Sequence, residues 1–524
     1  MNKEKFYITT PIYYPSGKFH IGTAYCEVLT DCIKRYKDFR GFDTFMLTGL
    51  DEHGLKIQKL AEEKNVSPKE HVDEMASKAL ELWELMDIKY DKFIRTTDEE
   101  HIECVKKIVS KFIENGDIYK STYAGLYCLP CENYFTESQL NDGLCPDCGR
   151  KVEIMEEEAY FFNIKKYENW LKEFYEQNPN FIVPESRKKE LFTNFINNGL
   201  EDLCISRCTF DWGIEMPNDP KHVLYVWLDA LTNYITALGY MSDDESLFNK
   251  YWPADLHVVG KEITRFHGIY WPIFLHALGL ELPKQILAHS WIIMKDGKMS
   301  KSMGNVIYPE FLIDNYGLDA VKFYLLRMMN FNQDSQFTPD DFVERYNSDL
   351  ANTLGNLLNR TVSMVNKYFD GVVPTNIIDR NEQTKDINDV KIETINNYIM
   401  NMDTYHISNA INDVWKLLSR ANKYIDETEP WMLYKEEKKE LLEDTMYNLV
   451  DSLRLSAIMI KPIMPNISDK IFEQLGLELN ELIFDNLVIN NIKEGLKVTA
   501  TPTPLFLRLD KGLEVEKIQA EMSN

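Results

Sequence analysis

The sequence predicts an α/β protein: a doubly wound parallel sheet, split by an insertion and followed by an all-α helical bundle. A short β-branched and aromatic pattern runs directly into a helical pattern near the start of the chain, and strand patterns of this kind return after position 218. Between them the chain changes to short strands and turns that contain two cysteine pairs. Beyond Leu325 apolar residues recur at helical spacing, which is typical of an antiparallel bundle.

Composition limits the classes of protein that the chain can belong to. Its 524 residues suggest three or four domains, and its 44% apolar content is that of an ordinary globular protein. The longest apolar segment, 269–280, is too short to span a membrane, and the first strand starts too early for a signal peptide. We therefore expect a cytoplasmic protein without a membrane partner. The net charge of −25 argues against binding nucleic acid over the whole surface, although a local basic path is compatible with it.

The first domain is predicted to be the first half of a Rossmann-type sheet, residues 1–117. A strand over Phe6–Thr10 is followed by turn residues and by a helix from Ile21, so His20, Gly22 and Thr23 fall in the first turn of that helix. Free backbone N–H groups and the helix dipole favour an anion there, although an ordinary helix start would look the same. A second strand ends near Thr48, and helices are expected over 54–64, 68–86 and 98–115.

The insertion, 118–217, carries a C-x2-C-x13-C-x2-C array and one expected helix near 167–177. Two thiolate pairs on tight turns match a tetrahedral zinc site, and four protein thiolates leave no position for a substrate. The array therefore predicts one structural Zn²⁺, with free buried cysteines as the alternative. The four ligands are Cys128, Cys131, Cys145 and Cys148.

The second half of the sheet is expected over 218–290, with strands at Val223–Trp227, Leu256–Gly260 and Ile286–Met294. A region over 291–348 opens with a loop, 296–305, that contains Lys298 and Lys301. Two lysines between glycines and serines suit a polyphosphate leaving group, although such runs are usually solvated surface loops. The bundle is expected over 349–524, with apolar stripes in 350–365, 407–425 and 442–460 and a polar tail after Val498.

The pair His-Ile-Gly-Thr and, far downstream, Lys-Met-Ser-Lys-Ser resembles the two signatures of class I aminoacyl-tRNA synthetases. Further stretches narrow the resemblance to the methionyl family over about Phe6 to Pro465: Leu-Thr-Gly-Leu-Asp-Glu-His-Gly, Tyr-Val-Trp-Leu-Asp-Ala, Val-Gly-Lys-Glu-Ile, Phe-His-Gly-Ile-Tyr-Trp-Pro and Glu-Pro-Trp. The resemblance implies activation of methionine by ATP with Mg²⁺, then transfer of the adenylate to the terminal adenosine of tRNA(Met), including initiator tRNA.

The resemblance also implies roles for residues, each of which would otherwise be a core or surface residue. For methionine these are Ile12, Tyr13, Asp51, Trp227, Ala230, Tyr234, Ile263, His267 and Trp271. For ATP they are His20, Gly22, Thr23, Lys261, Glu262 and Lys301, and for catalysis His20, Thr23, Lys298 and Lys301. For the CAU anticodon they are Asn356, Arg360 and Trp431, the last expected in a loop.

One departure from the family pattern concerns Thr23, which stands where the first signature usually has a second histidine. A threonine hydroxyl still donates to phosphate but carries no charge, so activity is expected to be retained.

The alternatives to a methionyl enzyme are a leucyl, isoleucyl, valyl or cysteinyl enzyme, a non-catalytic tRNA-binding relative, and a small nucleotidylyltransferase. The chain lacks the extra dimerising domain of many relatives, so a monomer is expected.

Overall fold

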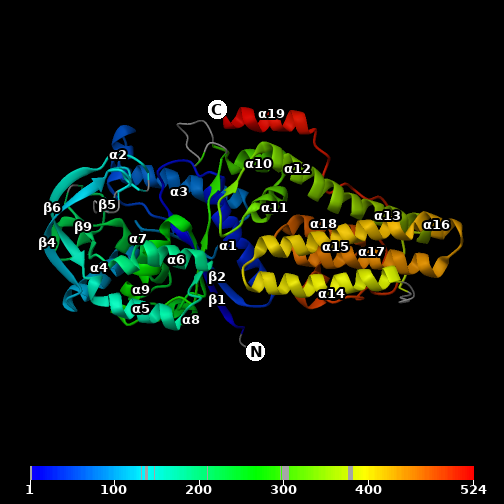
Figure 1. Cartoon of the computed structure of the whole chain (residues 1–524), viewed down its shortest axis with the longest axis horizontal. Coiled ribbons are helices and arrows are strands. Elements are labelled where there is room, and N and C mark those ends of the chain that lie inside the picture. Colours follow the sequence, from blue (N-terminus) through cyan, green and yellow to red (C-terminus); the bar gives the residue numbers. More distant parts are fainter. Residues whose placement is uncertain are drawn as a thin grey trace. The chain divides into compact units, whose positions relative to one another are not determined.

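The computed structural model describes residues 3–131, 133–135, 140–146, 148–208, 210–294, 297, 306–375 and 382–523. They form two compact units (Figure 1). Unit 1 is Met1–Phe19 with Asp43–Ser290, and unit 2 is His20–Phe42 with Trp291–Asn524. Among the residues so described, none of the helices combines the length and the apolar character that a membrane crossing requires.

Unit 1 is built on a six-stranded parallel sheet with the strand order β3-β2-β1-β12-β13-β7. Residues 6–10 of the central strand are all buried, as expected for a strand that is covered on both faces. The predicted parallel α/β fold is confirmed. The strands are β1 (Lys5–Tyr13), β2 (Asp43–Leu50), β3 (Lys92–Arg95), β7 (Ile182–Val183), β12 (Leu256–Gly260) and β13 (Ile286–His289).

The helices of unit 1 follow the sequence signals closely. Ser67 and Glu70 form a capping box, and Pro68 occupies the first helical position, so the chain starts a helix where predicted. Gly49 lets β2 approach β3, because a Cβ there would lie 2.0 Å from the Ile94 carbonyl oxygen. The helices are α2 (Leu55–Glu63), α3 (Pro68–Leu85), α4 (Glu99–Glu114), α5 (Glu168–Gln177), α6 (Glu185–Asn194), α7 (Val226–Thr236), α8 (Ser246–Tyr251) and α9 (Trp271–Leu278).

Of the three strands predicted for the second half of the sheet, Val223–Trp227 is wrong and Ile286–Met294 is confirmed only in its first part. The stretch Val223–Trp227 divides between β11 (Asp219–Leu224), which pairs antiparallel with β9 (Ser206–Arg207) and β10 (Glu215–Met216), and the start of α7. The second stretch, 286–294, divides into β13 and β14 (Ile292–Ile293), and β14 pairs with β15 (Ser335–Gln336). A short apolar run does not distinguish a strand from a buried helical turn, so periodicity failed at the start of α7. The strand predicted from Ile286 is present and joins the parallel sheet up to His289.

The insertion forms an antiparallel sheet of its own with the order β5-β4-β6-β8. Its strands are β4 (Ile118–Cys128), β5 (Asn133–Phe135), β6 (Glu153–Phe162) and β8 (Leu203–Cys204). The cysteine pairs lie at the end of this sheet where β4 stops. The insertion therefore holds the cysteine pairs on a sheet that is separate from the parallel sheet.

Unit 2 is mainly helical, and Figure 1 shows its long helices lying side by side. Helix α14 packs on α15, α15 on α17 and α17 on α18. The stripe predicted in 407–425 is buried at all six of its positions, which confirms the bundle. Its helices are α1 (Ile21–Phe39), α10 (Pro309–Tyr316), α11 (Leu318–Met328), α12 (Pro339–Arg345), the π-helix η7 (Tyr346–Gly355), α13 (Asn356–Phe369), α14 (Glu382–Asp403), α15 (Ile407–Thr428), α16 (Pro430–Lys435), α17 (Lys439–Ile460), α18 (Pro465–Leu475) and α19 (Lys511–Met522).

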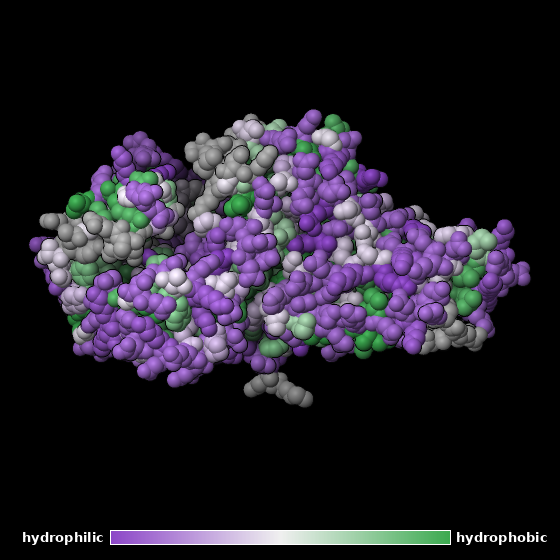
Figure 2. Space-filling model, viewed as in Figure 1, coloured by the Kyte–Doolittle hydropathy of each residue, from purple (hydrophilic) through white to green (hydrophobic). Residues whose placement is uncertain are grey.

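Specific polar contacts join distant segments of unit 2. Asp31 of α1 pairs with Lys322 of α11 at 3.0 Å, and both side chains are buried. The tail contains a helix that the sequence did not predict, α19, and Glu514 in it accepts a hydrogen bond from Tyr316 of α10 at 2.8 Å. On the face shown in Figure 2 hydrophilic residues predominate and hydrophobic ones form small patches, in keeping with the acidic composition.

Candidate functional site

The start of α1 in unit 2 is the place where the sequence predicts an anion site. His20 caps the helix: the Gly22 N–H donates to its Nδ1 at 3.0 Å, and the Ala24 N–H donates to its carbonyl at 3.1 Å. No acidic side chain lies in the first turn to neutralise the positive end of the dipole. The Thr23 N–H also donates to the His20 carbonyl, at 3.0 Å, so the three predicted residues share one turn.

The capping bond fixes which nitrogen of His20 carries the proton. Burial lowers the pKa of His20, which favours the neutral ring. Because Nδ1 accepts the Gly22 N–H, the single ring proton is on Nε2. His20 is therefore a neutral hydrogen-bond donor, a form that suits a phosphate oxygen.

In unit 1 the structure brings together the residues that the sequence predicted for an amino-acid side chain. The Asp51 N–H donates to the Tyr13 carbonyl at 2.9 Å, which holds the acidic residue beside the end of β1. Ile12 and Trp227 pack on a small apolar cluster that contains Ala230. An acidic group thus stands at the carboxyl ends of parallel strands, next to an apolar wall.

The deeper part of this cluster is aromatic. The Tyr234 hydroxyl lies 2.7 Å from His267 Nε2, and His267 Nδ1 lies 3.0 Å from the Ile263 carbonyl oxygen. The rings of Tyr234 and Trp271 are 5.7 Å apart. Burial lowers the pKa of His267 to about 4, against a smaller opposing effect of the Ile263 carbonyl. The histidine is accordingly neutral at pH 7.

The backbone around His267 is unusual, because residues Phe266–Tyr270 form a single π-helical turn, η5. Such turns are frequent at functional sites. Phe266 stacks on Trp227 with ring centroids 3.4 Å apart and an interplanar angle of 7°. This stack joins η5 to α7, so two of the elements that carry predicted pocket residues contact each other.

A buried aspartate with two histidines was missed by the sequence reasoning. Asp229 accepts from His53 Nδ1 and from His101 Nε2, both at 2.7 Å, and His101 Nδ1 lies 2.7 Å from the Thr236 hydroxyl. Burial alone would raise the pKa of Asp229, but the two histidines lower it to about 2. The signal was present, since His53 and Asp229 both lie inside stretches that carry the family resemblance.

This cluster ties the loop that carries Asp51 to helix α7. The next residue of the loop, Glu52, is buried and accepts from Arg95 Nε at 2.7 Å. The Trp212 indole N–H donates to the Glu52 carbonyl at 2.6 Å. The loop is therefore held from three sides, and the position of the Asp51 carboxylate follows from these contacts.

The remaining residues predicted for ATP lie in unit 1 or outside the described residues. Lys261 and Glu262 follow β12 directly in a short 3₁₀ turn in unit 1, as predicted. Gly260 allows the Glu262 carboxylate to fold back, because a Cβ there would lie 2.5 Å from Glu262 Oε2. Lys298 and Lys301 lie outside the described residues.

The four cysteines of the insertion converge as their spacing predicted. Their sulfur atoms all lie within 4.8 Å of one another, with Cys128 and Cys148 3.5 Å apart and Cys131 and Cys145 3.6 Å apart. A tetrahedral zinc with Zn–S bonds of about 2.3 Å requires sulfur atoms about 3.8 Å apart. The cluster is thus compatible with zinc.

The residues predicted for RNA lie in unit 2, with Asn356 and Trp431 exposed and Arg360 half-buried. Asn356 is exposed at the start of α13, and Arg360, one turn later, pairs with Asp426 at 3.3 Å. The expectation of a loop at Trp431 is wrong: it lies in helix α16, started by Pro430, and is 41% exposed. Tyr434 of α16 stacks on Tyr368 of α13, with ring centroids 4.7 Å apart, so the two elements are in contact.

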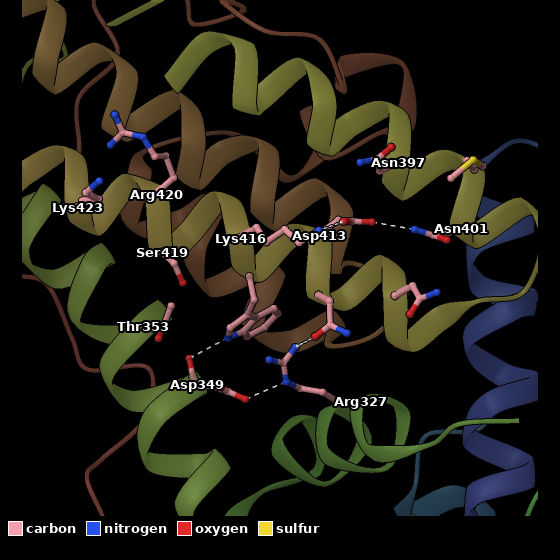
Figure 3. A pocket seen from close by; sticks show the side chains of 14 residues that line it. Arg327, Asp349, Thr353, Asn397, Asn401, Asp413, Lys416, Ser419, Arg420 and Lys423 are labelled. Carbon is pink, nitrogen blue, oxygen red and sulfur yellow. Dashed lines mark hydrogen bonds and ion pairs between the residues drawn. The ribbon is translucent and has the colours of Figure 1, made fainter. Parts of the chain in front are cut away.

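A groove of about 910 Å³ lies in unit 2 between η7, α14 and α15 (Figure 3). Figure 3 shows cationic side chains along α15. Within the groove lining, four cations face two carboxylates. The cations are Arg327, Lys416, Arg420 and Lys423, and the carboxylates are Asp349 and Asp413. Each of the four cations is paired with an acidic side chain: Arg327 with Asp349, Lys416 with Asp413, and Arg420 and Lys423 with Glu427. The groove is therefore lined by ion pairs.

Comparisons with known proteins agree with this geometry. Residues 6–153 and 148–362 match the family model of class I tRNA synthetases (M), and residues 373–522 match that of the anticodon binding domain of methionyl tRNA ligase. The Enterococcus faecalis methionine–tRNA ligase is 53% identical over 99% of this chain and 80% of its own length. The Clostridium acetobutylicum methionine–tRNA ligase is 52% identical over 98% of this chain and 80% of its own length. Among solved structures, the Mycobacterium tuberculosis methionyl-tRNA synthetase in complex with methionyl-adenylate superimposes with a TM-score of 0.91, at 39% identity over 96% of this chain and 100% of that one.

Proposed function

The chain belongs to the methionyl family of class I aminoacyl-tRNA synthetases, and from this premise we propose how its own residues act. The reaction is activation of L-methionine by ATP to methionyl-adenylate, followed by transfer to the 3′ adenosine of tRNA(Met), initiator tRNA included. One observation carries the proposal: in unit 1, an acidic residue at the strand ends stands beside a buried aromatic cluster that contains a neutral histidine.

Methionine lies with its ammonium on Asp51 and its side chain against the aromatic cluster. A carboxylate takes an ammonium in a charge-assisted hydrogen bond. Tyr234, His267 and Trp271 are the most deeply buried residues of the set and receive the thioether, which gains about 0.3–1.5 kcal/mol for each contact of sulfur with a ring. The wall nearer the strand ends consists of Ile12, Tyr13, Trp227, Ala230 and Ile263.

ATP binds with its phosphates at the start of α1. His20 Nε2–H, the Thr23 hydroxyl and the backbone at Gly22 donate to phosphate oxygens, and Glu262 accepts from a ribose hydroxyl beside Lys261. Lys298 and Lys301 stabilise the leaving pyrophosphate. The methionine carboxylate attacks the α-phosphate, so catalysis consists of positioning and charge stabilisation. Mg²⁺ accompanies ATP, held by phosphates and water.

The four cysteines of the insertion hold one structural Zn²⁺. All four ligands are thiolates of the protein, so no coordination position is left for a substrate. When bound, the metal would link the C-terminal end of β4 to the turns that carry the other three cysteines. Its part is to order the tip of the insertion.

The tRNA anticodon is read by Asn356, Arg360 and Trp431. An exposed indole provides a surface for stacking an unstacked base, and amide and guanidinium groups donate to base edges. Lys416, Arg420 and Lys423 line the groove on the same helix as Asp426, the partner of Arg360, so the groove offers a path for the phosphates of the adjacent stem. We expect the protein to act as a monomer in the cytoplasm.

Amino-acid-dependent ATP–pyrophosphate exchange without tRNA tests the proposal. Methionine should support exchange, whereas leucine, isoleucine, valine and cysteine should not. Exchange with one of those four instead would show that the pocket around Trp227 and His267 is wrongly assigned. Absence of exchange with every amino acid, from folded and zinc-loaded protein, would favour a non-catalytic tRNA-binding relative.

A further inference from the structure

The π-helix η7 lies in the middle of one continuous helical run that starts with α12 and ends with α13. A π-helix bonds residues five apart instead of four: the Asn356 N–H, for example, donates to the Ala351 carbonyl. Such segments are frequent at functional sites. Immediately after η7 come Asn356 and Arg360, two of the residues proposed to read the anticodon. The geometry of η7 therefore affects the direction in which these two side chains face.

The sequence itself favours a π-helix at this place. Apolar residues recur at intervals of four through the run, and all of them are buried. In an α-helix, residues four apart drift by about 40° around the axis, so five intervals would carry the stripe about 200° away, to the opposite face. Bonds to the fifth residue turn the chain less for each residue, which keeps the stripe on one side. Its members are Phe342, Tyr346, Leu350, Leu354, Leu358 and Val362.

Two side chains of α15 bind the backbone of η7. The Trp415 indole N–H donates to the Asp349 carbonyl at 3.2 Å (Figure 3), and Asn422 Nδ2 donates to the Thr353 carbonyl at 3.0 Å. A carbonyl oxygen has two lone pairs, so these bonds add to those along the helix. They join residues that are 66 and 69 positions apart along the chain. The two bonds therefore fix η7 against α15.

The orientation of α13 follows from that of η7. Gly355 ends the π-helix, and a Cβ there would lie 3.2 Å from the Leu350 carbonyl oxygen, five residues earlier, so glycine suits this close approach. A change of register by one residue in η7 would rotate α13 by about 100°. Asn356, which is exposed, would then turn away from its present direction.

We infer that Trp415 and Asn422 are positioning residues for anticodon reading: they hold η7 so that Asn356 and Arg360 face the RNA. Neither has to touch the RNA itself. Trp415 is only 4% exposed, and the Asn422 amide donates to two backbone carbonyls, those of Thr353 and Leu418. The inference rests on the proposed function, because it takes Asn356 and Arg360 as reading residues.

The test compares kcat/KM for aminoacylation of tRNA(Met) with that for the same tRNA carrying one changed anticodon base. Trp415→Phe keeps a ring but removes the N–H, and Asn422→Leu keeps the size but removes the donor. Each should lower the ratio of the two values by about 2- to 12-fold, the contribution of one hydrogen bond, with methionine-dependent pyrophosphate exchange unchanged. Asn315→Leu should keep the ratio and is the matched control, because the Asn315 amide donates to a carbonyl of its own helix, α10, at 2.7 Å.

A purely structural role would lower the use of both tRNAs in proportion, and that result, like an unchanged ratio, would overturn the inference. Gly355→Ala tests η7 without removing a bond, because the added Cβ crowds the Leu350 carbonyl and alanine favours an α-helix. This variant should also lower the ratio, and an unchanged ratio would show that η7 does not set the reading direction. Equal use of both tRNAs by the unmodified protein, or an unchanged ratio in Asn356→Ala, would instead refute the proposed anticodon reading.

Discussion

Replacement of Asp229 by asparagine tests whether the buried aspartate organises the loop that carries Asp51. The carboxylate accepts from His53 and from His101, and Asp229→Asn removes the charge and turns one oxygen into a donor that faces a histidine N–H. A hydrogen bond to a charged group contributes about 1.5–3 kcal/mol, and a buried donor left without its acceptor costs about 1–3 kcal/mol. We therefore expect the free energy of unfolding at pH 7 to fall by about 3 kcal/mol or more.

The pKa of Asp229 gives a second and independent magnitude. It is lowered from 3.8 to about 2 in the folded protein. At about 1.36 kcal/mol for each pKa unit, the ionised carboxylate contributes about 2 kcal/mol of stability. Because the folded pKa is the lower one, this contribution is present above pH 3.8 and is lost as the pH falls towards 2. The variant lacks it at every pH.

Urea denaturation of both proteins between pH 7 and the acid range provides the assay. The stability difference should be largest near neutrality and should shrink below pH 3.8. A difference below about 1 kcal/mol, the usual size for a residue without such contacts, would refute the reasoning. So would a difference that does not change with pH.

The two histidines provide a matched pair of variants for the same cluster. His53→Ala and His101→Ala each remove one bond to Asp229, and both should lower stability. Only His53 lies in the loop that carries Asp51, so only its variant should also raise the KM for methionine in pyrophosphate exchange, while the KM for ATP stays unchanged. Equal effects of both variants on that KM would show that the cluster acts on stability alone.

Three further predictions concern zinc and RNA. Cys145→Ser should abolish binding of one Zn²⁺ for each chain, measured by metal analysis, whereas Cys208→Ser should not, because Cys208 is outside the cluster. Trp431→Ala should lower kcat/KM for aminoacylation by about 5- to 150-fold, the equivalent of one lost base stack at about 1–3 kcal/mol, with pyrophosphate exchange unchanged. Tyr434→Ala, in the same helix but stacked on the protein, is the control. Lys416→Glu should weaken tRNA binding and reduce the slope of log Kd against log salt by about 0.7–0.9 for each lost phosphate contact, whereas Lys416→Arg should keep both.

The sequence by itself determined the elements whose signals are local. The buried run of β1, the caps of α3 and the stripe of α15 were predicted because chain chemistry and periodicity act within a few residues. The spacing of the cysteine pairs likewise predicted their convergence, since each pair sits on one short turn. The motifs also indicated the family.

Only the tertiary structure decided what depends on partners distant in sequence. Whether Val223–Trp227 continues a sheet depends on which strands lie beside it, and its partners are in the insertion. The position of Trp431 in a helix, and of the groove beside α15, depends on how the helices pack. The same holds for Asp229 between His53 and His101, 176 and 128 residues away along the chain. The protonation state of His267 also depends on the tertiary structure, because the burial that keeps its ring neutral exists only in the folded chain.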